Sequence, residues 1–147
     1  MTWHPIDLAA IIDAVVNGLD GDDAPTILRR SDGLGLFYPG EVNGIHGASG
    51  SGKTWFALHG CAQEVRSGRY VVYIDHEGNP RGIVRRLLAL GVTADEVAAR
   101  FLYVQPETAF PEGGEALVTF VRDFQPSLVV IDSTGEGLVL HGANPNA

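Results

Sequence analysis

The chain has 147 residues, of which 45% are hydrophobic and 19% charged, a composition typical of a soluble globular protein with one compact domain. The net charge of −8 argues against a broad basic face for nucleic acid, and leaves open a small basic patch or DNA contacts made by parts outside this chain. No apolar run approaches the ~20 residues that span a bilayer, and the first residues lack a secretory signal, so we expect no membrane contact.

The first 25 residues are predicted to form a helix and an acidic linker. Apolar residues at helical spacing predict the helix over residues 6–17, and Gly18 supplies its end. Aspartates and glycine over residues 20–25 are typical of a turn or linker. Residues 26–28 are predicted as a short edge strand at the beginning of the core, which we expect to occupy residues 26–147.

A glycine-rich segment lies between a predicted strand, residues 41–46, and a predicted helix, residues 54–67. It runs from Gly47 to Thr54 and fits the phosphate-loop pattern G-x-x-x-x-G-K-[ST] at every fixed position. Its Lys53 is the only lysine of the chain, a compact charge that can follow the β- and γ-phosphates of a nucleotide. Glycines let successive backbone N–H groups turn inward around an anion, at the N-terminus of the helix that follows. The residues expected to bind the nucleotide here are Gly47, Ser49, Gly50, Ser51, Gly52, Lys53, Thr54 and Trp55.

The rest of the chain alternates between apolar strands and amphipathic helices. The expected strands are residues 70–75, 101–104 and 127–132, and the expected helices are residues 79–90, 93–100 and 114–124. This alternation with short connections predicts an α/β fold, a three-layer sandwich around a parallel sheet with right-handed crossovers. Cys61, the only cysteine, falls on the apolar stripe of a helix, so we expect a buried side chain and a reduced, cytoplasmic setting.

Two acidic side chains follow strands at the edge where ligands bind in such sheets. Asp132 comes after four apolar residues, as in a Walker B strand, and we expect it to hold Mg²⁺ beside the Thr54 hydroxyl. The alternative is a polar residue that only ends a buried strand. Glu77, just past the strand at 70–75, is placed to orient and deprotonate an attacking water. Its alternative role is to cap the next helix, which Asn79 could also do.

Three arginines lie on the helix that follows Glu77. Arg81 and Arg85 are four residues apart and so share a face, which we interpret as a solvated surface stripe. Arg86 is the candidate for stacking on adenine or pairing with a phosphate. His76 has no second histidine or cysteine at metal-ligand spacing and is interpreted as a spacer.

Together these segments resemble the RecA-like ATPase core, most closely the RepA-type branch of hexameric replicative helicases and AAA-family ATPases. The segments that carry the resemblance are residues 38–42, 47–54, 72–77, 85–87, 90–91, 128–133 and 140–142. The resemblance implies a P-loop NTPase fold, ATP and Mg²⁺ as cofactors, Glu77 as the catalytic glutamate and a homo-oligomer, a hexamer in that branch. The family's core continues with further strands, a γ-phosphate sensor, DNA-facing loops and an arginine finger. This chain stops about fifteen residues after Asp132, so we expect a core that is incomplete at the C-terminus, as a fragment, a shortened or split product, or a piece ending in a loop.

Three functions are compatible with these residues. The first is Mg²⁺-dependent ATP hydrolysis by an ATPase of the DNA helicase, replication or recombination type, with Lys53 and Glu77 as catalytic residues and DNA bound through elements outside this chain. The second is a nucleotide-binding module or scaffold without turnover of its own, which the shortened core favours. The third, a small-molecule kinase, is disfavoured because an arginine-rich lid is missing between residues 101 and 125, where only Arg122 occurs.

Overall fold

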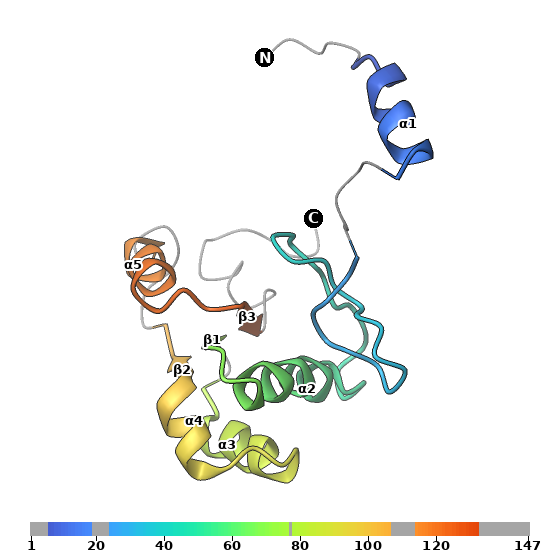
Figure 1. Ribbon diagram of the computed structural model, residues 1–147. Coiled ribbons are helices and arrows are strands. Elements are labelled where there is room, and N and C mark those ends of the chain that lie inside the picture. Colours follow the sequence, from blue (N-terminus) through green and yellow to red (C-terminus); the bar gives the residue numbers. More distant parts are fainter. Residues whose placement is uncertain (1–5, 19–23, 77, 107–113, 133–147) are drawn as a thin grey trace.

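Residues 6–18, 24–76, 78–106 and 114–132 are described in a computed structural model of the chain (Figure 1). In chain order the elements are α1 (Ala9–Val16), α2 (Lys53–Arg66), β1 (Val71–Asp75), α3 (Pro80–Ala89), α4 (Ala94–Arg100), β2 (Phe101–Val104), α5 (Gly114–Phe124) and β3 (Leu128–Asp132). Glu77 and residues 133–147 lie outside the described residues, so the predictions that concern them have no structural counterpart here.

The three strands form one parallel sheet in the order β2-β1-β3. The register sets Val71 opposite both Phe101 and Leu128, and Asp75 opposite Asp132, so β1 and β3 end side by side. β1 is central and buried at every position, which agrees with its unbroken apolar run. In Figure 1, α2, α3 and α4 lie on one side of the strands and α5 on the other. This arrangement confirms the predicted α/β sandwich with a parallel sheet.

The main core lies between the sheet and the helices α2 and α3. Its buried side chains are Leu58, Cys61, Ala62 and Val65 of α2, Val71 and Tyr73 of β1, Ile83 and Leu87 of α3, and Val92. Burying a side chain such as Leu87 contributes about 1.5–3 kcal/mol. Burial also raises the pKa of the Cys61 thiol, so the prediction of a small, unreactive core side chain is confirmed.

The helices α3 and α4 begin at the predicted caps. The Asn79 side-chain oxygen accepts a hydrogen bond from the backbone N–H of Gly82 at 2.9 Å, so Asn79 is a cap of α3. At α4, the N–H of Glu96 donates to Thr93 Oγ1 at 3.2 Å, and the N–H of Thr93 donates to Glu96 Oε2 at 2.8 Å. This reciprocal pair satisfies two N–H groups that the helix itself leaves without acceptors.

Two predicted strands in the first half of the core are wrong. Residues 26–28 form only a single antiparallel bridge, between Ile27 and Phe37, because Leu28 has φ of 55° and leaves the extended conformation. Residues 41–46 form no strand, and Val42 is fully exposed. The segment contains only two branched apolar residues, and within the described part of the chain no strand pairs with it.

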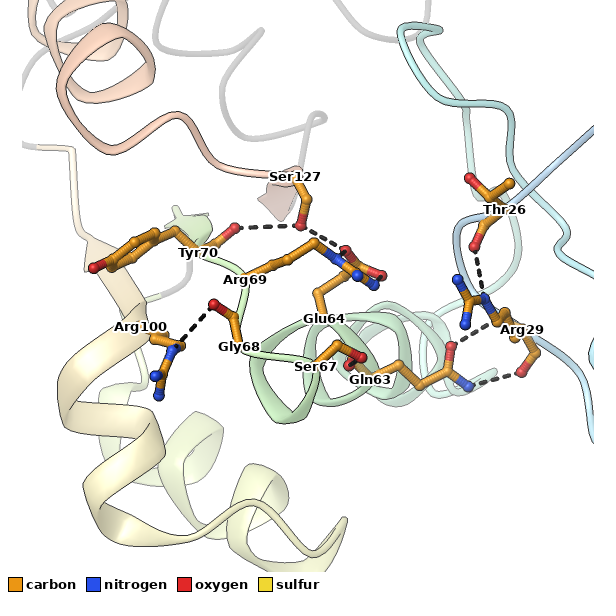
Figure 2. A network of polar contacts seen from close by, with 10 residues as sticks. All are labelled: Thr26, Arg29, Gln63, Glu64, Ser67, Gly68, Arg69, Tyr70, Arg100 and Ser127. Atoms are coloured by element: carbon orange, nitrogen blue, oxygen red, sulfur yellow. Dashed lines mark hydrogen bonds and ion pairs between the residues drawn. The ribbon is translucent and has the colours of Figure 1, made fainter. Parts of the chain in front are cut away.

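A buried carboxylate ties α2 to the beginnings of β1 and β3 (Figure 2). Glu64 is 2% exposed and accepts hydrogen bonds from Arg69 Nε at 2.5 Å, from Arg69 Nη2 at 2.8 Å and from Ser127 Oγ at 2.5 Å. Burial by itself raises the pKa of Glu64, but the bonds from Arg69 and Ser127 outweigh burial and hold the pKa below its ordinary value. The network therefore fixes the end of the sheet opposite to the strand termini at Asp75 and Asp132.

The helix α1 begins at Ala9, whose N–H donates to Asp7 Oδ1 at 3.0 Å, and is shorter than the predicted helix over 6–17. None of its residues is buried, and its apolar side chains, such as Ile11 and Ile12, are more than half exposed. Within the described residues, every helix is too short or too polar to cross a membrane.

Candidate functional site

The glycine loop, residues 47–54, turns into α2 through two glycines in the left-handed region. Gly50 has φ of 77° and Gly52, the N-cap of α2, has φ of 90°. A side chain at either position would be strained, which explains why the pattern needs glycine at position 52 and why this chain also has glycine at position 50. Glycine is favoured at position 47 for a different reason, because a Cβ there would lie 2.8 Å from Ser51 Oγ. Since Gly52 has no side chain, the first N–H groups of α2 have no side-chain cap, as a helix N-terminus that binds an anion requires.

The Lys53 ammonium lies over this loop. Its Nζ donates to the carbonyl oxygens of Gly47 at 2.8 Å and of Ala48 at 2.9 Å. These two bonds hold the only ammonium side chain of the protein beside the uncapped N–H groups. The helix dipole and the ammonium both favour negative charge at this point.

The two residues predicted to hold a metal ion are in direct contact. Thr54 Oγ1, in the first turn of α2, donates to Asp132 Oδ2, at the end of β3, at 2.9 Å. The hydroxyl of Tyr73 donates to the same oxygen at 2.6 Å. Burial, and next the hydrogen bond to Asp132, raise the pKa of Tyr73, so this phenol remains the donor. A hydroxyl and a carboxylate are hard oxygen ligands, and Mg²⁺ sites commonly combine one or two of these with phosphate oxygens and water.

The neighbouring acid, Asp75, shapes the turn that leads into α3. It is 3% exposed and accepts hydrogen bonds from the N–H groups of Gly78 at 3.1 Å and Asn79 at 3.2 Å. It also accepts one from the Tyr103 hydroxyl at 2.7 Å, and burial together with this bond raises the pKa of Tyr103. Asp75 thus fixes the backbone of Gly78 and Asn79 at the start of α3.

The two other predicted nucleotide contacts also lie together. The Arg86 guanidinium, on α3, stands 5.6 Å from the centre of the Trp55 ring, on α2, and Trp55 is 45% exposed. This distance is within the range of a cation–π contact. Ser49 and Ser51 are exposed in the loop, where the N–H of Ser51 donates to the Ala48 carbonyl at 3.2 Å.

Tyr73 and Tyr103 were not among the predicted site residues, although both touch acids at the strand ends. The signal for Tyr73 was its spacing of two from Asp75, which places both on the face of β1 that meets α2. Tyr103 gave no such signal, because the residue two positions further along its own chain segment is Gln105 and not an acid. The structure brings the loop, Lys53, Thr54 and Asp132 to one end of the sheet.

Comparison with known proteins agrees with this geometry. A family described as AAA domain matches residues 16–147. The chain is 34% identical over 101 residues to the plasmid "Protein RecA" of Lactococcus lactis subsp. lactis, which covers 69% of this chain and 28% of that protein. It is 35% identical over 107 residues to "Protein RecA" of Desulforapulum autotrophicum, and 37% identical over 101 residues to that of Fusobacterium nucleatum.

These two alignments cover 72% and 69% of this chain, and 28% and 25% of the relatives. The chain therefore spans little more than a quarter of the length of these relatives. The sheet, the glycine loop and the matches together show a RecA-like P-loop NTPase fold. With a family match over residues 16–147, the chain belongs to the AAA domain family.

Proposed function

We propose that this protein binds ATP with Mg²⁺ and hydrolyses it, as part of a RecA-like ATPase. The observation that carries the proposal is the contact of 2.9 Å between Thr54 and Asp132, next to a glycine loop that holds the only lysine. This contact brings the proposed phosphate-binding groups and the proposed metal-binding groups together in one place. Similarity to the AAA domain family and to RecA proteins supports the same activity.

In this proposal the N–H groups of residues 50–54 hold the β-phosphate. Lys53 exchanges its bonds with the Gly47 and Ala48 carbonyls for bonds to the β- and γ-phosphates, which are stronger because both partners are charged. Thr54 and Asp132 hold the magnesium ion, directly or through water. A magnesium ion held by these two residues would supply positive charge to offset the negative charge that develops on the phosphate oxygens.

Glu77 is the proposed base that orients and deprotonates the attacking water. Asp75, two residues before Glu77 in the sequence, accepts hydrogen bonds from the N–H groups of Gly78 and Asn79. Trp55 and Arg86 are proposed to contact the adenine base or a phosphate, because an exposed ring and a guanidinium both stack on bases.

Assembly and nucleic-acid partners belong to the same proposal. We expect a homo-oligomer, a hexamer if the chain comes from the RepA-type helicase branch, acting in the cytoplasm on DNA in replication or recombination. With a net charge of −8, DNA contacts are expected from elements outside this chain. DNA-stimulated turnover would support this branch, and unchanged turnover would contradict it.

The test replaces Glu77 with Gln, which removes the base and keeps the side-chain size. We expect ATP affinity to stay within about threefold and the hydrolysis rate to fall at least ~100-fold. Glu115→Gln, the same change in the first turn of α5, is the matched control and should leave both values unchanged. Equal rates for Glu77→Gln and wild type would remove Glu77 from the mechanism. Tight ATP binding by a wild type that does not hydrolyse it would favour the nucleotide-binding module instead.

A further inference from the structure

Two tyrosines occupy paired positions on neighbouring strands and contact different acids. Tyr73 of β1 is the register partner of Tyr103 of β2, and their rings are stacked with centres 6.4 Å apart and planes 9° apart. The Tyr73 hydroxyl donates to Asp132 Oδ2 at 2.6 Å, while the Tyr103 hydroxyl donates to Asp75 Oδ2 at 2.7 Å. The same kind of residue thus meets each acidic strand end.

Tyr73 has almost no freedom to move. Its side chain is completely buried, and its ring packs against two rings of the neighbouring strand β2: that of Tyr103 and that of Phe101, whose ring centre is 5.7 Å away. A buried hydroxyl needs a hydrogen-bond partner, and within the described residues Asp132 is the partner of this one. Packing in the core therefore fixes the position of the Tyr73 hydroxyl, and the hydrogen bond from this hydroxyl fixes the Asp132 carboxylate.

Three elements meet on one carboxylate oxygen. Oδ2 of Asp132, on β3, accepts from Thr54 on α2 and from Tyr73 on β1. Two donors on one oxygen restrict the rotation of the carboxylate group. In the described part of the chain no hydrogen bond is made to the other oxygen, Oδ1, which is the atom left for a metal-bound water.

We propose that Tyr73 is a positioning residue for magnesium: it holds Asp132 so that one oxygen faces Thr54 and the other serves the ion. The inference rests on the proposed function, in which Asp132 and Thr54 hold Mg²⁺. Groups that orient a metal ligand commonly change metal affinity 10–100-fold when removed, without touching the metal.

Loss of the Tyr103 hydroxyl leaves its partner carboxylate with more hydrogen bonds than loss of the Tyr73 hydroxyl does. Its partner Asp75 also accepts from the N–H groups of Gly78 and Asn79, so that carboxylate stays fixed without the phenol. Among the side chains that the structure describes, Asp132 keeps only Thr54 as a donor when the Tyr73 hydroxyl is removed. Tyr103→Phe is therefore a matched control for Tyr73→Phe, since each removes one hydroxyl and keeps the ring stack.

The experiment measures Mn²⁺ affinity of the ADP-bound protein by electron paramagnetic resonance, and ADP affinity without metal by calorimetry. Tyr73→Phe should weaken Mn²⁺ binding about tenfold, with metal-free ADP affinity unchanged within about twofold. Tyr103→Phe should leave both affinities unchanged within about twofold. In Tyr73→Phe/Asp132→Asn, Mn²⁺ affinity should equal that of Asp132→Asn alone, because Tyr73 acts through Asp132.

Equal Mn²⁺ affinity for wild type and Tyr73→Phe would overturn the inference. So would an equal loss in both tyrosine variants, because this would reveal a purely structural effect. Tyr73→Phe keeps all ring contacts, and Asp132 is only half-buried, so water can replace the lost donor and the variant should fold. An Asp132→Asn variant that binds Mn²⁺ like wild type would instead show that the proposed function itself is wrong.

Discussion

Single side chains around the glycine loop make contacts that a nucleotide can replace. Lys53 bonds to two carbonyl oxygens of its own loop, and Arg86 stands over Trp55. In each pair the cation is a group that can bind a phosphate or stack on a base, so we expect nucleotide binding to exchange its present partner for the nucleotide. The pattern of fixed glycines predicted the loop from sequence, because the reason for glycine is local: the left-handed backbone at Gly52 and the close approach of Ser51 at Gly47. The contact between Trp55 and Arg86 was beyond prediction, since it depends on how α3 packs against α2.

At this scale, Arg86→Ala should weaken ATP binding about fivefold, because a stacked guanidinium contributes about 1 kcal/mol at a partly exposed site. Arg85→Ala removes the neighbouring, exposed arginine of the same helix and should change affinity by less than twofold. Calorimetric titration with ATP and Mg²⁺ gives both values. Equal affinities in the two variants would exclude Arg86 from the nucleotide site.

Among the elements, α2 has two functional ends. Its N-terminus carries the loop, Lys53 and Thr54, and its last turns carry Glu64, which anchors the starts of β1 and β3. Because the helix is rigid between these ends, the network around Glu64 helps to fix the position of the glycine loop relative to the ends of β1 and β3. The helices α3, α4 and α5 were predicted closely, since caps and apolar periodicity are local signals. Residues 41–46 were predicted wrongly because strand formation depends on a partner that the segment itself does not encode.

We predict that Arg69→Ala lowers the free energy of unfolding by about 2–3 kcal/mol, because it leaves Glu64 buried without its cation. This loss is at or below the lower end of the ~3–5 kcal/mol that breaking a buried ion pair usually costs. The reason is that the Arg69 side chain is 41% exposed to solvent. Arg66→Ala, in the last turn of α2, is the control, with an expected loss below about 0.5 kcal/mol. Urea unfolding of the three proteins measures this; equal stabilities would show that the ion pair is not stabilising.

The same network gives a pH dependence with a definite sign. The folded state holds the pKa of Glu64 below its ordinary value of 4.5, so the unfolded state binds more protons in acid. The stabilisation from the ion pair is present above pH ~4.5 and is lost as the pH falls through the folded pKa. The difference between wild type and Arg69→Ala should therefore be largest near neutral pH and shrink in acid.

For the whole molecule, the alternation of strands and helices was enough to predict the layers. It also predicts the end of the sheet at which a ligand is expected. The family match covers residues 16–147, which includes every element from α2 to β3. Partners were less predictable: the apolar side chains of α1 are exposed, and nothing in the chain's periodicity identifies what covers them. The net charge of the chain restricts which partners its surface can bind. It does not determine whether the glycine loop binds an anion, because that depends on hydrogen-bond donors within the loop.

The most direct test of the central claim is an amide-resolved NMR titration with ATP and Mg²⁺. The account predicts that the N–H signals of residues 50–54 shift strongly and saturate, while those of α4 do not. In Lys53→Ala the affinity should fall at least about tenfold, since a charge-assisted bond contributes ~1.5–3 kcal/mol. Loop signals that stay unmoved at saturating ATP, or equal affinity in Lys53→Ala, would contradict nucleotide binding at this loop.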